Sequence, residues 1–301
     1  MKKIHFVLLL VFASKVWACD ICGGVHANSS IGLFAANRFH TIGLSTQYRS
    51  YQSFDNGQIH SKEDFLLNSL QLRLQVGSKL QFYGQVPYQI GRQQLAENQT
   101  LKSGLGDVQL FTNQIVLQCK DSSGITHQFV SAAIGIKAPT GKFVSPSNLQ
   151  QNLYPGTGSW DFSLLLNGFQ KLNKKLGIQS EISHTWKRKN DYAFRYGNSS
   201  QLSTALVLND KISSYRLLSS IGFQADYFAS NSWEWAPLAA SAQHKGVLLQ
   251  SKMSCHLLTY NWLYSLQINL PLWQNINTGT LYFRPQIQFS IQYLIQQKKK
   301  S

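Results

Sequence analysis

Apolar and polar side chains alternate at every second position over much of this chain. The clearest run covers residues 281–296, and the runs 260–272 and 79–91 repeat it. A helix would scramble this sorting because its faces repeat about every 3.6 residues. The pattern therefore predicts β-strands that have one apolar and one polar face. In the run 281–296, one face carries Leu281, Phe283, Ile287, Phe289, Ile291, Tyr293 and Ile295, and the other carries Arg284, Gln286, Gln288, Ser290, Gln292 and Gln296.

The same alternation predicts a sheet of twelve strands, of which 106–119, 200–209 and 246–258 alternate less cleanly. A sheet in hydrocarbon must close on itself so that every backbone N–H and C=O group finds a partner. We therefore predict an all-β fold, a transmembrane antiparallel β-barrel. Its strands are expected at residues 40–51, 64–77, 79–91, 106–119, 127–138, 159–172, 175–187, 200–209, 213–227, 246–258, 260–272 and 281–296.

The predicted connections alternate in length, which supports the barrel independently. Outer-membrane barrels have short periplasmic turns and longer external loops, so an even strand number places both termini in the periplasm. A soluble β-sandwich would also give strands of period two, and it is kept as an alternative. Three prolines inside strands, Pro87, Pro271 and Pro285, are expected at rims or bulges. The longer connections are 52–63, 92–105, 139–158, 188–199, 228–245 and 273–280.

The N-terminus has the pattern of a cleavable export signal. Lys2 and Lys3 precede an apolar stretch at 6–12, and the small-residue site Val16-Trp17-Ala18 predicts cleavage before Cys19. The sequence around Cys19 also loosely resembles a lipobox, which would leave Cys19 acylated. The expected organisation is a signal peptide at 1–18, a periplasmic segment at 19–39 that could plug the barrel, the barrel at 40–296 and a basic tail at 297–301.

Composition agrees with a wall between lipid and water. Only 14% of the residues are charged, against about 25% in a typical soluble domain. The net charge of +15 favours anionic lipid headgroups or anionic solutes as partners, and no basic helix or RNA-binding motif points to nucleic acid. No later segment has the apolar length of a membrane helix. Aromatic residues expected at the membrane interfaces are Tyr48, Tyr88, Trp160, Trp186, Trp262 and Trp273.

Three glycine-rich motifs lie in the central third of the chain. They are SGLGDV at Ser103–Val108, KAPTGKF at Lys137–Phe143 and PGTGSWDF at Pro155–Phe162. Together they resemble a family of outer-membrane barrels named for the MetA pathway of phenol degradation, which are described loosely as transporters. CDICGG at Cys19–Gly24 resembles the N-termini of related barrels of Bacteroidetes-type bacteria, although Gly24 stands where those commonly have a third Cys. The resemblance implies an exported barrel and names no solute.

In the predicted topology the three motifs meet at the extracellular rim around the loop 139–158. One interpretation is that they shape a rigid rim, since Gly and Pro permit tight turns and close backbone approach. The other is that the loop folds inward as a constriction, with Asp107, Lys142 and Asp161 near the pore mouth. The candidate rim residues are Gly104, Gly106, Asp107, Pro139, Thr140, Gly141, Lys142, Pro155, Gly156, Gly158, Trp160 and Asp161.

If the apolar face of each strand contacts lipid, the other face lines the lumen. That face carries more basic than acidic residues, and rings of basic residues favour anions in pores. A wall whose charges pair locally would have no such preference. The candidates for the lumen are Arg49, Arg73, Lys137, Arg216, Lys252 and Arg284, with Asp161, Glu181 and Asp226 as the acidic residues.

Cys19 and Cys22 form a CxxC motif that His26 follows. The motif lacks the adjacent His of c-type haem attachment, so no haem is expected. A disulfide suits the oxidising periplasm, a metal site would need a fourth ligand such as His40, and lipidation of Cys19 is the third alternative. No other cofactor is expected.

The leading functional hypothesis is an outer-membrane channel for small hydrophobic or anionic solutes. A non-conducting structural or surface-binding barrel is the second. The third, a lipid hydrolase, would need a Ser beside His184 on the outer wall, and the sequence shows no nucleophile elbow. We therefore expect no enzyme. The expected partners are outer-membrane lipid and a small solute, and the sequence leaves the oligomeric state open.

Overall fold

The computed structural model describes six stretches of the chain. The predicted signal peptide, Cys19, Cys22, His26 and the basic tail lie outside the described residues. The described stretches are 39–95, 98–122, 126–144, 153–212, 214–234 and 244–296.

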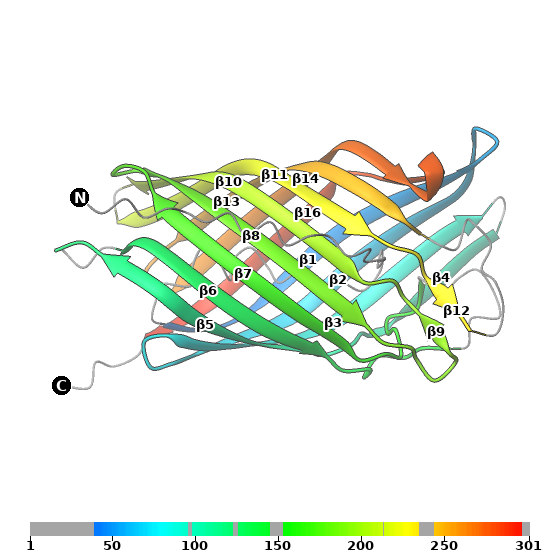
Figure 1. Ribbon diagram of the computed structural model, residues 1–301, viewed down its shortest axis with the longest axis horizontal. Helices are drawn as coiled ribbons and strands as arrows, with labels where there is room; N and C mark the ends of the chain where they lie inside the picture. Colours follow the sequence, from blue (N-terminus) through cyan, green and yellow to red (C-terminus); the bar gives the residue numbers. More distant parts are fainter. Residues whose placement is uncertain are drawn as a thin grey trace, which may run out of the picture.

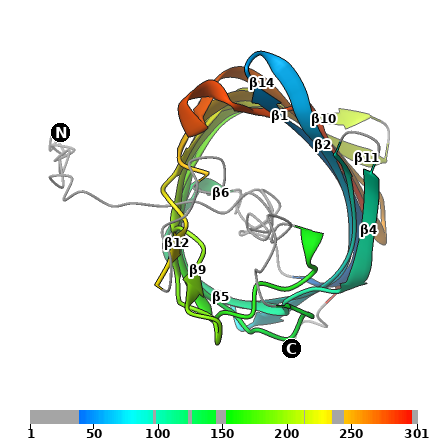
Figure 2. The same cartoon turned by 90° about the vertical axis from the view of Figure 1, so that its right-hand side faces the viewer.

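The chain forms a closed antiparallel β-barrel (Figures 1 and 2). The sheet has 14 strands, and it closes because β1 pairs with both β2 and β16 while β14 pairs with β13 and β16. The strands are β1 (Phe39–Asp55), β2 (Gln58–Val76), β3 (Leu80–Leu95), β4 (Asn98–Leu105), β5 (Gln109–Lys120), β6 (Thr126–Lys137), β7 (Asp161–Lys171), β8 (Leu176–Lys187), β10 (Ser199–Ile212), β11 (Tyr215–Phe228), β13 (Gly246–Leu258), β14 (Trp262–Ile276), β15 (Leu281–Phe283) and β16 (Gln286–Gln296).

Two positions in the wall are each divided between two strands. β4 and β5 follow one another along β3, and β15 and β16 follow one another along β1. The barrel therefore has 12 strand positions, which confirms the predicted fold and strand number and excludes the β-sandwich. A second sheet of two short strands, β9 (Phe194–Arg195) and β12 (Ser232–Trp233), lies beside the barrel end. The described residues include no helix of a length and apolarity that could cross a membrane.

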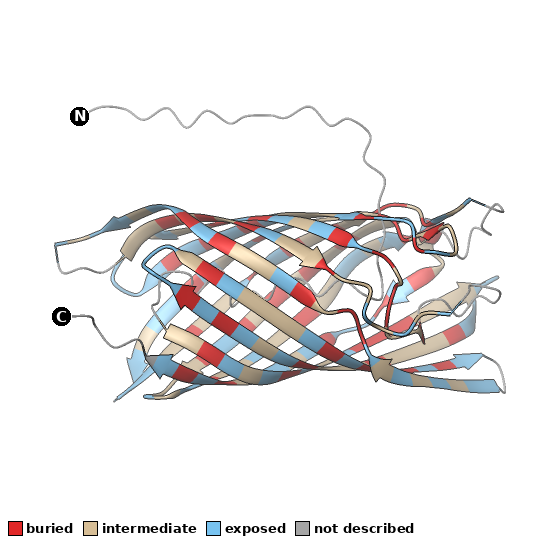
Figure 3. Ribbon diagram, turned by 90° about the horizontal axis from the view of Figure 1, so that it is seen from below, coloured by how far each residue is buried: buried red, intermediate tan, exposed pale blue. Residues whose placement is uncertain are grey.

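Burial is inverted relative to a soluble protein, with large apolar side chains outside and polar side chains inside. Leu44, Ile134 and Phe223 are 64%, 66% and 57% exposed, whereas Asn113 and Ser131 on the inner face are both 0% exposed. Figure 3 shows this as alternating buried and exposed residues along each strand. Side chains of a strand alternate between its two faces, so a closed barrel with this pattern presents an apolar surface to lipid and a polar surface to the lumen.

The two ends of the barrel differ in their connections. At the short-turn end, as we call it, β2–β3, β7–β8, β10–β11 and β13–β14 are joined by tight turns, and Phe39 pairs with Gln296 where the barrel starts and finishes. At the opposite, long-loop end, β6–β7, β8–β10 and β11–β13 are joined by longer segments. These connections agree with the alternation of short and long connections that the sequence predicted.

Two of the predicted long loops were wrong because the strands continue through them. β1 and β2 are joined by a two-residue turn at Asn56 and Gly57, whose φ angles of 48° and 79° suit a tight hairpin. Most of 52–63 is therefore strand, as the Asn-Gly pair could have signalled. Likewise β3 and β4 extend the wall as a second hairpin through most of 92–105.

The prolines mark interruptions of the sheet, as predicted. The β13–β14 register shifts at Pro271, and Arg284 and Pro285 separate β15 from β16. Pro87 lies where its neighbour changes from β4 to β5, and its carbonyl accepts a hydrogen bond from the backbone of Gly106 at 2.8 Å. The strand predicted at 106–119 thus starts after this break, at Gln109.

Candidate functional site

The three glycine-rich motifs meet at the long-loop end. A Cβ added to Gly141 would lie 2.7 Å from the Cα of Gly156 and 2.8 Å from the carbonyl carbon of Gly106. Backbone from three separate segments therefore touches at one point, which only glycine permits. The residues that surround this contact, Asp107, Lys137, Thr157, Ser159 and Asp161, are here called the rim cluster.

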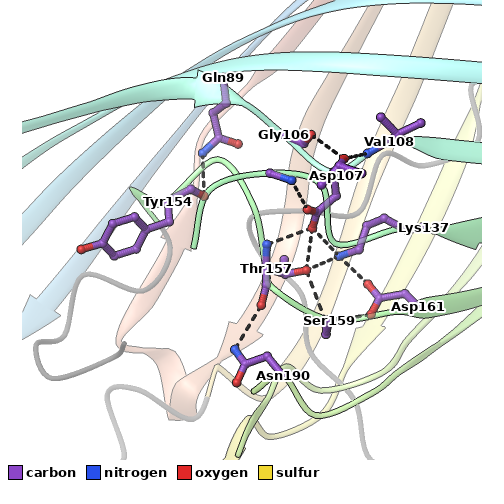
Figure 4. Close-up of polar contacts among 12 residues, drawn as sticks. Gln89, Gly106, Asp107, Val108, Lys137, Tyr154, Thr157, Ser159, Asp161 and Asn190 are labelled. Atoms are coloured by element: carbon purple, nitrogen blue, oxygen red, sulfur yellow. Dashed lines mark hydrogen bonds and ion pairs between the residues drawn. The ribbon is translucent and has the colours of Figure 1, made fainter. Parts of the chain in front are cut away.

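Asp107 ties the segments together through its carboxylate. Its Oδ1 accepts the backbone N–H of Gly141 at 2.9 Å, and its Oδ2 accepts the backbone N–H and the hydroxyl of Thr157 at 2.9 and 2.7 Å (Figure 4). Hydrogen bonds to an ionised acceptor are stronger than neutral ones. The side chain of Asp107 thus fixes two points of the segment 138–160 to the break between β4 and β5.

Lys137, the last residue of β6, lies between two carboxylates. Its ammonium is 2.5 Å from Oδ2 of Asp161 and 3.5 Å from Oδ2 of Asp107, and it donates to the hydroxyl of Thr157 at 2.7 Å. The side chains of Lys137, Asp107 and Asp161 are only 8%, 4% and 3% exposed. Ser159 donates to Asp161 at 3.1 Å. Buried charges persist only when paired and hydrogen-bonded, and this cluster meets both conditions.

Other predicted rim residues support the same contact. The hydroxyl of Thr140 accepts the backbone N–H of Val108 at 2.9 Å, and the carbonyl of Lys142 accepts the N–H of Gly156 at 3.2 Å. Gly158 has φ of 68°, Pro155 lies against Gly104 and Gly106, and Pro139 adjoins Thr140 at the exit of β6. Trp160 differs, since 49% of its surface is exposed. The structure thus brings together nearly all of the residues that the motifs named.

The segment held by the rim cluster places Leu153 against the inner wall. Leu153 is 0% exposed and belongs to an apolar cluster whose other members face inward. The ring centroids of Tyr51 and Phe283 are 4.7 Å apart, and Phe228 stacks on Phe283 at 5.7 Å. We call this group the lumenal apolar cluster; it comprises Tyr51, Phe65, Leu153, Phe228, Leu248, Ile276, Leu281 and Phe283.

This cluster shows that residues 153–160 reach into the lumen. These residues lead into β7, whereas the cluster lines β11, β13, β14, β15, β1 and β2, which lie across the ring. The carbonyl of Tyr154 accepts a hydrogen bond from Gln89 of β3 at 3.4 Å. In Figure 2, which looks at this end, the bright green segment that follows the grey break near residue 150 passes inside the ring of strands. Leu153 and Tyr154 are therefore placed as the inward-folding interpretation expects. The close contact of the glycines is what the rigid-rim interpretation expects.

Aromatic contacts join this segment to the next long connection. Phe143 lies 5.9, 5.8 and 6.4 Å, between ring centroids, from Tyr154, Tyr192 and Tyr196. Asn190 donates to the carbonyl of Thr157 at 3.1 Å. Thr157 and Ser159 lie within the PGTGSWDF motif, although the sequence analysis gave them no individual role. It also gave no role to Leu153, Phe143 or Asn190.

Most of the predicted lumen residues are buried on the inner face. Arg49, Arg73, Lys137, Glu181 and Lys252 are all 8% exposed or less, as are Asp161 and Asp226. The prediction holds for the face of Arg216 but was wrong for Arg284, and likewise for Leu281 and Phe283, which were expected on the outer face and are buried inside.

Arg216 has the inward parity but is exposed, because it lies at the short-turn end, one residue into β11. Arg284 is exposed because the Arg284–Pro285 step changes the inward parity from odd in β15 to even in β16. The guanidinium of Arg284 donates to Oε1 of Gln52, with the Nε at 3.1 Å.

The inner wall carries more acidic residues than the sequence suggested. Sequence reasoning missed buried Lys187 and inward Glu63, whose carboxylate accepts from Gln93 at 2.7 Å. The carboxylate of Asp226 accepts hydrogen bonds from Gln224 at 3.0 Å and Gln250 at 2.6 Å. Buried acidic residues therefore accompany the buried basic ones, and the preference for anions stays a prediction.

No group of three or more His, Cys, Asp or Glu within the described stretches is arranged to hold a metal ion. Cys19, Cys22 and His26 lie outside those stretches, so the CxxC alternatives stay predictions. Nδ1 of His40, the suggested fourth ligand, accepts the backbone N–H of Gln75 at 3.1 Å. Cys119 and Cys255 are exposed free thiols.

His184 has a serine partner that sequence reasoning missed. His184 of β8 and Ser200 of β10 are directly paired, and Nδ1 of His184 is 2.8 Å from the hydroxyl of Ser200. The imidazole also meets the ring of Trp186 edge-on at 4.5 Å between centroids. Ile182, Trp186 and Leu202 mark this face as the outer one, since they are 51%, 45% and 57% exposed.

Comparison with known proteins shows a likeness at the level of fold. An outer-membrane channel from Pseudomonas putida F1 is similar over 94% of this chain and 100% of its own, with 14% identity and a TM-score of 0.62. The β domain of the Bordetella autotransporter BrkA covers 85% of this chain and 99% of its own, with 8% identity and a TM-score of 0.51. These are outer-membrane barrels. This chain has the same closed-barrel architecture.

No protein-family model and no curated protein sequence matches this chain. The resemblance to barrels of the MetA pathway and of Bacteroidetes-type bacteria therefore stays a prediction, and the barrel fold is what the structural neighbours support.

Proposed function

We propose that this protein is an outer-membrane channel for small hydrophobic solutes, constricted by residues 153–160. The observation that carries the proposal is the lumenal apolar cluster, because Leu153 reaches it from the opposite side of the barrel. Ligand sites lined by aromatic and aliphatic side chains favour apolar molecules. Of the two solute classes that the sequence suggested, the hydrophobic one thus has a structural basis.

The rim cluster gives the constriction its rigidity. Lys137, Asp107 and Thr157 hold the segment at its base, and the glycine contact leaves no room for it to shift. A solute would pass between Leu153 and the aromatic rings rather than displace the whole segment. In the proposed orientation, the long-loop end faces the outside and the short-turn end faces the periplasm.

Uptake by intact cells tests the solute class. Cells whose outer membrane carries the protein would be given a neutral aromatic compound and a carboxylate of similar size. We expect faster uptake of the neutral compound than in cells without the protein, and little gain for the carboxylate. Equal gains would contradict the hydrophobic preference. No gain for either, together with silent single-channel recordings, would favour the non-conducting barrel.

Lipid hydrolysis is a second candidate, favoured by the His184–Ser200 contact on the lipid-facing wall. A Ser beside a His base is the start of a nucleophilic site. We regard the protein as a non-enzyme unless phospholipid in mixed micelles is hydrolysed and both His184→Ala and Ser200→Ala abolish the activity. Hydrolysis that survives either substitution would point to a contaminating enzyme.

A further inference from the structure

Basic side chains gather around one carboxylate on the outer face at the long-loop end. Nη2 of Arg92 lies 3.2 Å from Oδ2 of Asp64, and Nζ of Lys62 lies 3.9 Å from the same atom. Arg284 donates to Gln52, which pairs directly with Lys62 across β1 and β2. We call Lys62, Arg92 and Arg284, together with Asp64, the outer cationic patch.

The patch has more positive than negative charge. Lys62 and Arg92, whose side chains are 43% and 48% exposed, share the carboxylate of Asp64, and Arg284 adds a third cation beside β1. The neighbouring Glu63 points inward, where it accepts from Gln93. Asp55 lies further along, at the tip of the β1–β2 hairpin. The excess charge therefore faces outward from the wall.

The height of the patch places it at the lipid headgroups. The hydroxyl of Tyr48 donates to Oδ1 of Asp64 at 2.7 Å, and Tyr48 and Tyr88 are 42% and 41% exposed on the same face. Aromatic residues of this kind mark the membrane interface. Towards the short-turn end the same strands carry exposed Leu44 and Leu70, which belong to the hydrocarbon band. The cations thus lie just beyond the interfacial tyrosines.

We propose that the outer cationic patch binds the phosphate groups of lipid A, the phosphorylated glycolipid anchor of lipopolysaccharide. Arg284 lies beside β1 and Arg92 lies on β3, so cations extend over three inter-strand steps, or about 14 Å. Arg and Lys are the usual ligands of phosphate, and Arg can donate two parallel hydrogen bonds. A headgroup with phosphates at both ends fits a patch of this width better than a single phosphate does.

The test measures lipid A affinity of the full-length protein in detergent micelles, with a fluorescent diphosphorylated lipid A as the probe. The patch variant combines Lys62→Gln, Arg92→Gln and Arg284→Gln. A matched control combines Lys79→Gln, Lys174→Gln and Lys211→Gln, which remove the same charge from exposed positions at the short-turn end. Heat-modifiable mobility in gels checks that each variant is folded.

We expect the patch variant to bind lipid A at least about tenfold more weakly, since each basic residue near an anionic lipid surface contributes roughly fivefold. The control variant should bind as the parent does, and dephosphorylated lipid A should bind the parent weakly. Equal weakening in both variants would overturn the proposal, as would unchanged binding by the patch variant. Equally effective competition by inorganic phosphate or by phosphatidylglycerol would replace lipid A with a generic anion.

Discussion

Two charged clusters lie at the same end of this barrel, on opposite faces of its wall. In the rim cluster, Lys137 lies between two carboxylates and all three side chains are nearly inaccessible. In the outer cationic patch, Asp64 lies among more cations than it can neutralise, and those cations are half exposed. Buried charge must be paired within the protein, whereas exposed excess charge is available to a ligand. The rim cluster therefore stabilises the fold of the barrel end, and the outer cationic patch is free to bind an anionic ligand.

The largest expected effect comes from removing the central cation of the rim cluster. Lys137→Met leaves Asp107 and Asp161 buried without their partner, which typically costs about 3–5 kcal/mol. We expect a lower urea midpoint in vesicles and rapid proteolysis within 138–160. Lys142→Met, in the same segment but exposed, is the control. Adding Asp107→Asn and Asp161→Asn to Lys137→Met should restore part of the loss, and a further loss would contradict the electrostatic explanation.

The next effect concerns the constriction itself. Leu153→Ala removes the side chain that closes the lumenal apolar cluster, and buried Leu-to-Ala changes cost about 2–5 kcal/mol. We expect a weaker docking of the segment and a larger single-channel conductance. Leu105→Ala, on the lipid-facing side where Leu105 is 59% exposed, should leave conductance unchanged. If both variants conduct as the parent does, Leu153 does not limit the pore.

A smaller effect is expected from the glycine contact. Gly156→Ala would force a methyl group into the backbone of Gly141, and overpacking of this kind costs about 1–3 kcal/mol. The segment should shift, which faster proteolysis within 138–160 would reveal. Gly168→Ala in β7 is a matched control because an added Cβ there meets nothing within 4 Å. Equal proteolysis of the two variants would show that the close approach is not what positions the segment.

The sequence predicted the barrel well because lipid imposes a rule on every second residue. Alternation predicted the faces of 286–296 and its repeats, the number of strands and the meeting of the three motifs. It failed at Arg284, because the Arg284–Pro285 step changes which residues face inward, and at 52–63, where the Asn56-Gly57 turn signal was not used. Leu153 could not be predicted, since its role depends on a loop crossing to strands that are distant in sequence.

The smallest effect on stability should come from the outer cationic patch, and it sharpens the contrast with the rim cluster. Asp64→Asn removes a carboxylate whose ion pairs are largely exposed, so the cost should be about 0–1 kcal/mol, far below that of Lys137→Met. Because the patch then gains positive charge, the affinity for lipid A should rise while the urea midpoint barely changes. Weaker lipid A binding with a large loss of stability would mean that Asp64 organises this face as Asp107 organises the rim. The two clusters would then differ in exposure alone, and their different charge balance would have no bearing on ligand binding.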